Sequence, residues 1–380
     1  YLCILDQAGE IRLHQNIKTD RGLFLNLIKP FQNDIVIAVE CTRQSGQVFT
    51  WYWIADLCKD HCIPFVLGHA LYMKAIHGGK AKNDKIDSHK IAVLLRGGMI
   101  PMAYTYPASM RATRDLLRRR NHLMRKRAEL YAHIQNTRSQ YNLSDYLGRI
   151  AKPQHREGIT EQFDDPSVRK MIGADFAVIQ AYDPIIARME RGIISMANNH
   201  NPVAYALLKT IPGIGRILGL VILYEIENIN RFPSVQDFAS YARLVKCSKE
   251  SNGKKSGTGG KKIGNAHLKW AFSEAAALFL KGNEPGKKYL DRLANKHGKG
   301  KALSILAHKI GRAVYFMLKN KKPFDQKDSW GFRVGGDGSA RGLTGTITGI
   351  EHVLASNRGQ DNPCIQEHPA DGMPVSPIIP

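Results

Sequence analysis

Two acidic residues at helical spacing are the first candidates for chemistry. Asp84 and Asp87 lie three residues apart in KNDKIDSHKIA (residues 82–92), where a helix is expected to begin. This spacing places both carboxylates on one face of the helix, near the positive end of its dipole. Such a pair either caps the helix or holds a hard divalent cation, because Mg²⁺ binds one or two carboxylates and keeps water for a phosphate substrate.

Glu40 is a third candidate ligand. It directly follows the apolar run IVIAV of residues 35–39, which is typical of a strand buried on both faces. Taken alone, Glu40 would simply mark the exit of the strand into solvent. The end of a central strand is also where α/β sites are usually built. Together with Asp84 and Asp87, Glu40 predicts a metal-dependent site for phosphoryl transfer.

A lysine-rich, glycine-rich segment carries the candidate nucleophile. Residues 246–269 hold seven lysines and five glycines against one acid, Glu250. Glycine backbone lets a phosphate approach closely, and lysines attract it. Ser251 lies beside these lysines, and its hydroxyl can attack a phosphodiester if the developing charge is stabilised. Ser248 and Ser256 compete with it, and the alternative is a flexible basic loop that binds nucleic acid without catalysis.

A glycine turn precedes the most apolar part of the chain. Gly213 and Gly215 lie in IPGIG (residues 211–215), ahead of an apolar helix. This arrangement resembles the hairpin of helix-hairpin-helix modules, whose backbone N–H groups bind a DNA phosphate without reading sequence. A plain turn between two helices is the alternative. The net charge of the chain favours the DNA interpretation.

The composition indicates a polyanionic partner. The chain has 55 Lys and Arg residues against 33 Asp and Glu residues, which gives a net charge of +22. Nucleic acid is the first expectation and an anionic membrane surface the second. Insertion into a membrane is excluded, because the most apolar run, residues 217–224, is shorter than the roughly 20 residues that a span requires. Six scattered cysteines fit a reducing, cytoplasmic compartment.

The elements that position these residues fall into four segments: residues 1–105, 106–200, 201–325 and 326–380. The first alternates strands and helices, which predicts a mixed sheet covered by helices. Its expected strands and helices are 1–5, 11–16, 19–28, 35–39, 45–58, 64–67 and 84–95. The third segment is expected to be helical. The fourth is rich in glycine and proline without periodicity, so it is expected to be mostly disordered.

The second segment is expected to be a helical connector. Leu117, Met124, Tyr131 and Arg138 recur every seven residues within a long amphipathic helix, residues 108–142, that has a basic outer face. This coiled-coil-like pattern is consistent with contact to nucleic acid, with packing against a second subunit, or with the solvated face of an ordinary bundle helix.

These motifs, in this order, resemble the DEDD-type insertion-sequence transposases, a family that includes the pilin-gene invertases and the bridge-RNA-guided recombinases. The likeness covers roughly residues 1–320, and its longest motifs are the most specific. The matching residues are the strand ending at Glu40, KNDKIDSHKIA, IPGIG, NRFPSVQDFASYARLVK (230–246) and ESNGKKSGTGGKKIGNAHLKWAFSEAA (250–276). The resemblance implies a RuvC-like (RNase H fold) N-terminal domain and a helical, serine-bearing C-terminal transposase domain.

The resemblance also implies roles for individual residues. Glu40, Asp84 and Asp87 would be the second, third and fourth acids of a tetrad that binds Mg²⁺ or Mn²⁺, and Ser251 would form a covalent phosphoserine link to DNA. The partners implied are DNA, a structured noncoding RNA and further copies of the chain, as a dimer or tetramer. The residues expected to contact nucleic acid are Gly213, Gly215, Lys254, Lys255, Lys261, Lys262 and Asn265.

One departure from the family pattern concerns the first acid. The family places an Asp on a strand ahead of the one that matches residues 1–5, and this sequence does not contain that segment. Asp6 lies at the hairpin turn and is a poor substitute. We therefore expect an N-terminally incomplete chain that binds metal weakly as it stands.

Two rival functions fit the same residues. A metal-dependent junction resolvase or nuclease would use water in place of Ser251. A noncatalytic nucleic-acid-binding remnant would bind DNA in a salt-dependent way and cut nothing. The function expected from the resemblance is composite: the acidic site holds the metal against the scissile phosphate, and Ser251 of the same or another subunit attacks.

Overall fold

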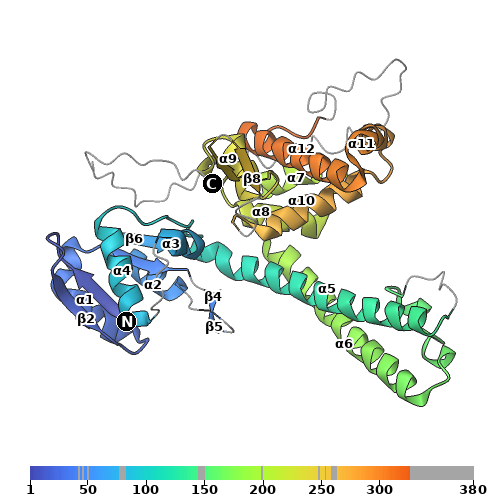
Figure 1. Ribbon diagram of the computed structural model, residues 1–380, viewed down its shortest axis with the longest axis horizontal. Coiled ribbons are helices and arrows are strands. Elements are labelled where there is room, and N and C mark those ends of the chain that lie inside the picture. Colours follow the sequence, from blue (N-terminus) through green and yellow to red (C-terminus); the bar gives the residue numbers. More distant parts are fainter. Residues whose placement is uncertain are drawn as a thin grey trace. The chain divides into compact units, whose positions relative to one another are not determined.

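The computed structural model contains two compact units, one formed by residues 1–109 and the other beginning at residue 110 (Figure 1). The residues that the structure describes are 1–41, 43–44, 47–48, 51–76, 83–143, 150–197, 200–246, 249–252, 254–257 and 263–325. The expected tail, residues 326–380, lies outside them. The first unit combines strands with helices and the second is almost entirely helical, so the expectation of an α/β part followed by a helical part is confirmed.

Two small sheets form the centre of the first unit. Strands β1 (Leu2–Leu5) and β2 (Ile11–Gln15) pair antiparallel, whereas β3 (Ile37–Glu40) and β6 (Phe65–Gly68) pair parallel. The remaining elements are α1 (Arg21–Ile28), the 3₁₀ helix η1 (Lys29–Asp34), β4 (Arg43–Gln44), β5 (Gln47–Val48), α2 (Tyr52–Asp60), α3 (Ala70–Ile76) and α4 (Asp84–Arg96).

Helices cover both faces of these strands. On one face, Ile4 of β1 and Ile37 of β3 pack with Phe24 and Ile28 of α1 and with Leu57 of α2. On the other face, α3 and α4 form a second cluster, centred on Met73 and Leu94, against Ala38 of β3 and Val66 of β6. The alternation of neighbours along β3 is that of a strand covered on both sides. The strand is nevertheless only half-buried beyond Ile37, because it borders the cavity described below.

A long antiparallel helical hairpin opens the second unit. Helices α5 (Ala108–Gln140) and α6 (Pro166–Ala197) are joined through η2 (Pro153–His155) and η3 (Thr160–Gln162). Four isoleucines seven residues apart are buried on α6: Ile172, Ile179, Ile186 and Ile193. Ion pairs link the two helices at Arg120–Glu190 and Arg127–Asp183, and a hydrogen bond joins His133 and Asp175. The coiled-coil-like face predicted for α5 therefore packs against α6 of the same chain.

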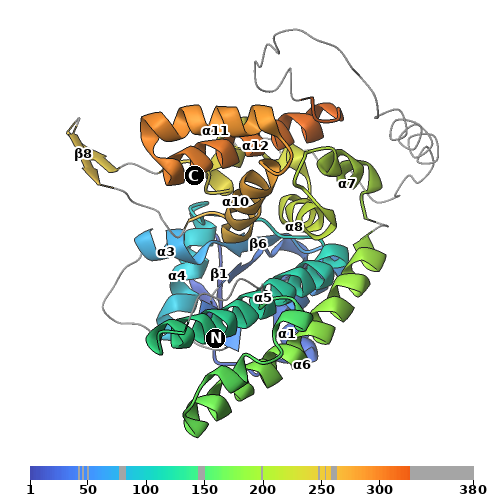
Figure 2. The ribbon, with the colours of Figure 1, turned by 90° about the vertical axis from the view of Figure 1, so that its right-hand side faces the viewer.

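The rest of the second unit is a helical domain around a single apolar core. Its elements are α7 (Pro202–Lys209), α8 (Arg216–Ile226), η4 (Ile229–Arg231), α9 (Val235–Tyr241), β7 (Lys249–Ser251), β8 (Lys254–Gly257), α10 (Ala266–Phe279), α11 (Glu284–His297) and α12 (Lys299–Asn320). Helices α10 and α11 both pack against α12 (Figure 2). Helix α8 is buried nearly throughout, which explains its almost uninterrupted apolar sequence. Among the described helices, none is long and apolar enough to cross a membrane.

Candidate active site

Glu40 is the last residue of strand β3 and lies in register with Gly68 of β6. The N–H of Cys41 donates to the carbonyl of Gly68 over 3.0 Å, which extends the parallel ladder one residue past Glu40. The side chain of Glu40 is half-buried. It therefore lies at the carboxyl end of a parallel strand pair, the edge of the sheet that the sequence predicted.

Asp84 and Asp87 lie in the first turn of α4, as expected, but neither caps the helix. The N-cap is Asn83, whose side-chain oxygen accepts from the N–H of Ile86 over 2.8 Å. Because the cap is supplied by Asn83, the capping alternative does not explain the two acids. Both carboxylates remain near the positive end of the helix dipole, where negative charge is favoured.

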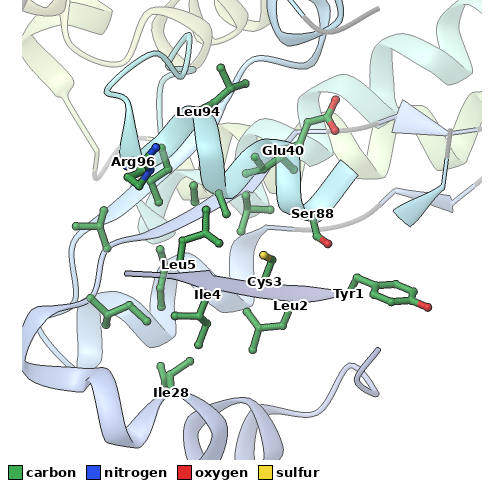
Figure 3. Close-up of a pocket in the computed structure, with 18 of the residues that line it drawn as sticks. Tyr1, Leu2, Cys3, Ile4, Leu5, Ile28, Glu40, Ser88, Leu94 and Arg96 are labelled. Atoms are coloured by element: carbon green, nitrogen blue, oxygen red, sulfur yellow. The ribbon is translucent and has the colours of Figure 1, made fainter. Parts of the chain in front are cut away.

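The three acids line one cavity. It has a volume of about 1570 Å³, and Glu40, Asp84 and Asp87 all line it. The cavity lies between β1 and β3, beneath α4. Figure 3 shows Glu40 and Ser88, the neighbour of Asp87, toward the end of the cavity nearer Tyr1, with Arg96 at the other end. The end of β3 and the start of α4 therefore contribute their acids to the lining of one hollow of the first unit.

The three carboxylates do not form a complete metal site. Within the described parts of the chain, no group of three His, Cys, Asp or Glu side chains lies close enough together to hold a metal ion. Carboxylate oxygens are nevertheless the ligands that hard divalent cations prefer. The carboxylates at the cavity are of the chemical type that binds such a cation, but by their arrangement they do not form a complete set of ligands.

The segment around Ser251 forms a β-hairpin. Ser251 ends β7 and its backbone pairs with that of Lys254, the first residue of β8. Asn252, directly after β7, has φ +51°, the left-handed conformation that is typical of tight hairpin turns. The sequence predicts a helical segment over residues 201–325, with a flexible basic loop as the alternative here, and the Asn252-Gly253 pair was the signal that could have predicted the hairpin.

The other candidates of this segment are distributed unevenly. Lys254 is exposed, and Lys255 and Ser256 lie on β8. Ser248, Lys261 and Lys262 lie outside the described residues. The hairpin therefore brings Ser251 and two of the predicted lysines into one small element, while their contacts with nucleic acid stay a prediction.

Asn265 is directed into the protein interior. It is the N-cap of α10, and its side-chain oxygen accepts from the N–H groups of His267 and Leu268 over 2.9 and 3.1 Å. Its amide nitrogen donates to Glu225 over 2.8 Å. The sequence assigned Asn265 to nucleic-acid binding. That role stays a prediction, and the structure gives both ends of the amide internal partners.

The glycine turn joins α7 to α8. Gly213 has φ +87°, and a Cβ atom there would lie 2.6 Å from backbone atoms of Leu278 and Phe279. Gly215 is the exposed N-cap of α8 and adopts extended backbone. The two glycines therefore differ: Gly213 permits a close approach to α10, whereas Gly215 lies at the surface where a helix begins.

A buried ionic group was missed by sequence reasoning. Glu225 is only 2% exposed, and it accepts hydrogen bonds from Arg114, Arg118 and Asn265. Burial would raise the pKa of Glu225, but the Arg118 hydrogen bond and the charges of Arg114 and Arg118, with the Asn265 amide, lower it to about 2. The available signal was a single acid inside the apolar run of α8.

Comparison with known families decides what this chain is. Residues 1–142 match the DEDD transposase family of IS110 elements, and residues 205–291 match the family described as "Transposase IS116/IS110/IS902 family". Together the two matches span more than half of the chain. The chain belongs to the DEDD-type insertion-sequence transposases. The first match contains the three acids, and the second contains Ser251 and the glycine turn.

A curated relative extends the similarity to most of the transposase. The chain is 21% identical over 341 residues to the "Transposase for insertion sequence element IS1111A" of Coxiella burnetii (strain RSA 493 / Nine Mile phase I). The aligned region covers 85% of this chain and 87% of that protein. The protein is thus a DNA transposase, and its family indicates dependence on a divalent metal.

Proposed function

We propose that this transposase cuts and rejoins DNA strands through a covalent phosphoserine formed by Ser251, with divalent metal held at Glu40, Asp84 and Asp87. The observation that carries the proposal is the place of Ser251. It stands at the tip of a lysine-bearing hairpin, inside the segment that matches a transposase family. A nucleophile at a tip can enter a DNA groove, and Lys254 beside it neutralises phosphate charge.

The reaction conserves the energy of the phosphodiester bond. The Ser251 Oγ bonds to phosphorus, the bond from phosphorus to one deoxyribose oxygen breaks, and that oxygen takes up the serine proton and leaves as a DNA hydroxyl. A DNA hydroxyl from the other strand then attacks the phosphoserine and restores the serine. Bound Mg²⁺ or Mn²⁺ would supply charge neutralisation at the phosphate. No ATP is needed, because each step exchanges one phosphoester for another.

The first unit is proposed to be a RuvC-like domain whose cavity receives a further strand. The cavity is larger than the roughly 300–1,000 Å³ of a small-molecule site. It lies between β1, which pairs with β2, and β3, which pairs with β6. Apolar side chains such as Ile28 and Leu94 line it from both faces. The family's first acid, carried on a strand seated there, would complete the ligand set at Glu40, Asp84 and Asp87.

The glycine turn and the long hairpin are proposed to bind nucleic acid. Gly215 is exposed at the start of α8, where the first backbone N–H groups of a helix have no partner within the helix. A helix-hairpin-helix-like contact to a DNA phosphate would use them.

The proposed partners are DNA, a structured noncoding RNA and other copies of the chain, as a dimer or tetramer. The net charge of +22 supports the nucleic-acid partners.

The test is to trap the covalent intermediate. The transposase, preceded by a strand that supplies the first acid, is incubated with Mg²⁺ and a DNA duplex carrying the end of its insertion sequence. We expect a protein–DNA adduct that maps to Ser251, that Ser251→Ala abolishes and that Ser256→Ala on the same hairpin retains. Cleavage that persists in Ser251→Ala without an adduct would favour the rival nuclease that uses water.

A further inference from the structure

The residues that flank the hairpin segment on its two sides, here called the hairpin base, are tied together. The N–H of Asn265 donates to the carbonyl of Tyr241 over 2.6 Å, and the Arg243 guanidinium donates to the carbonyl of Ile263 over 2.7 Å. Gly264, between them, has φ +86°, and a Cβ atom there would lie 2.6 Å from the Tyr241 oxygen. The chain therefore leaves the end of α9 and re-enters at α10 through one closed base.

Asn265 joins this base to the buried ionic group. One end of its side chain caps α10, and the other donates to the carboxylate of Glu225. A serine at this position would still cap the helix, but it would lack the amide that reaches Glu225. The cap and the link to Glu225 can thus be separated by substitution.

Glu225 in turn holds the start of the long helix α5. Arg114 donates to it over 3.0 Å through Nε, and Arg118 donates through both Nε and Nη2 over 2.6 and 2.9 Å. Arg114 and Arg118 lie in the first turns of α5, close to residue 109, where the unit that contains the three acids ends. The group therefore connects the base of the Ser251 hairpin to the helix by which the chain leaves the acidic unit.

Buried ionic groups are an inefficient way to stabilise a core. Removing charges from water is costly, and well-packed apolar residues often give equal or greater stability. The group instead fixes direction, because the planar Arg118 guanidinium meets the carboxylate through two hydrogen bonds. The geometry of the group is better suited to fixing the relative positions of the segments it joins than to stabilising the core.

We propose that Asn265 and Glu225 are positioning residues for Ser251. They hold the hairpin base in a fixed place relative to α5, so that Ser251 is presented to phosphate in one position. This inference rests on the proposed function of Ser251 as nucleophile. Neither residue touches the DNA in this role, since both are buried.

The experiment compares two asparagine caps in the protein used for the Ser251 test, assayed with the same Mg²⁺ and DNA. Asn265→Ser removes the link to Glu225. Asn201→Ser is the matched control, because Asn201 caps α7 in the same way, through the N–H of Ala204. We expect Asn265→Ser to slow adduct formation roughly 10- to 100-fold, the cost of a small misplacement of a reacting group, with DNA affinity unchanged. Asn201→Ser should leave the rate near that of the parent protein.

A second readout does not depend on catalysis. Amide hydrogen exchange of β7 and β8 should accelerate in Asn265→Ser and stay unchanged in Asn201→Ser, because only the first variant releases the hairpin base. If Asn265→Ser fails to fold, Arg118→Lys is the alternative variant. Lysine keeps the positive charge but cannot make the two hydrogen bonds of the guanidinium to Glu225. The control for Arg118→Lys is Arg119→Lys, at an exposed position of α5.

The outcomes separate this inference from the proposed function. Adduct formation that survives Ser251→Ala refutes the nucleophile, and the positioning role falls with it. If Ser251→Ala abolishes the adduct, but Asn265→Ser behaves as Asn201→Ser does in both rate and exchange, only the positioning role is overturned. Slower adduct formation with faster exchange in Asn265→Ser alone supports it.

Discussion

The backbone of Gly213 lies against the end of helix α10, where a Cβ atom at residue 213 would lie 2.6 Å from the carbonyl carbon of Leu278. Gly213 also has φ +87°, whereas Gly215 in the same turn has φ −82° and open space around it. We expect Gly213→Ala to lower the free energy of unfolding by about 2–4 kcal/mol, because the left-handed conformation and the backbone contact both oppose a methyl group.

Gly215→Ala is the control for this substitution. It should cost under about 1 kcal/mol, since alanine is only a poorer N-cap than glycine. Urea unfolding of both variants tests the difference. Equal stabilities would mean that the close packing of the turn against α10 is not present in solution.

The stability of the second unit should depend on pH through His267. Burial, and then the charge of Arg118, lower the pKa of His267 from 6.5 to about 4. The unfolded chain therefore binds a proton between these values that the folded chain does not, so stability is lost as the pH falls from 6.5 toward 4. The melting temperature of His267→Gln should fall less steeply over this interval than that of the parent protein. His122→Gln, at an exposed position, is the control and should follow the parent protein. If the melting temperature of His267→Gln fell with pH as steeply as that of the parent protein, the assignment to His267 would be wrong.

Glu225 should be costly to replace despite its inefficiency as a stabilising device. Glu225→Gln leaves Arg114 and Arg118 with an uncompensated charge in a buried site, which typically costs about 3–5 kcal/mol. Glu274→Gln, on the exposed side of α10, should change stability by less than about 0.5 kcal/mol. Chemical denaturation distinguishes the two, and a small effect at Glu225 would show that water reaches the group.

The acids of the cavity should matter for cleavage and not for folding. Glu40→Gln, Asp84→Asn and Asp87→Asn should each abolish Mg²⁺-dependent DNA cleavage while the circular dichroism spectrum is unchanged, because each removes a candidate ligand at the cavity.

Asp6→Asn is the matched control, since Asp6 lines the same cavity. The Asp6 carboxylate already accepts from the N–H of Glu10 and pairs with Arg12. The Asp6→Asn substitution should leave cleavage intact. Equal loss of activity in Asp6→Asn would show that the assay reports the fold of the first unit and not metal binding.

Lys254 should contribute to DNA affinity through charge alone. Each phosphate contact to duplex DNA adds about −0.9 to the slope of log K against log salt concentration, so Lys254→Ala should reduce that slope by about this amount. Lys287, an exposed lysine already paired with Glu284, provides the control substitution. Fluorescence anisotropy over a salt series measures both slopes, and identical slopes would place Lys254 outside the interface.

Local patterns predicted the elements whose signals lie within a few residues. The start of α4 at Asp84 and the strand before Glu40 followed from spacing and from an apolar run. The helix expected over residues 45–58 was wrong at its start: the chain pairs as short strands at residues 43–44 and 47–48, and α2 begins only at Tyr52. The aromatic residues Trp51, Tyr52 and Trp53, which suggested a helix, lie only at its actual start.

Long-range relationships could not be predicted in the same way. In the group of Glu225, Arg114 and Asn265, the contacts to Glu225 span 111 and 40 positions of the chain, and no periodicity links these residues. The sequence predicted Glu40 at the carboxyl end of a strand, and the structure places Glu40, Asp84 and Asp87 on the lining of one cavity. Whether the three carboxylates lie close enough together to bind one metal ion depends on the directions of their side chains, which the sequence does not give.

The cavity between β1 and β3 also affects the tendency of the purified protein to self-associate. Within the described residues, each of these strands has one neighbour, so a row of backbone donors and acceptors faces the hollow on either side. Such rows recruit extended segments of other molecules and seed aggregation. A preparation with this hollow unfilled should self-associate as its concentration rises. A short apolar peptide that docks as a strand should keep it monodisperse.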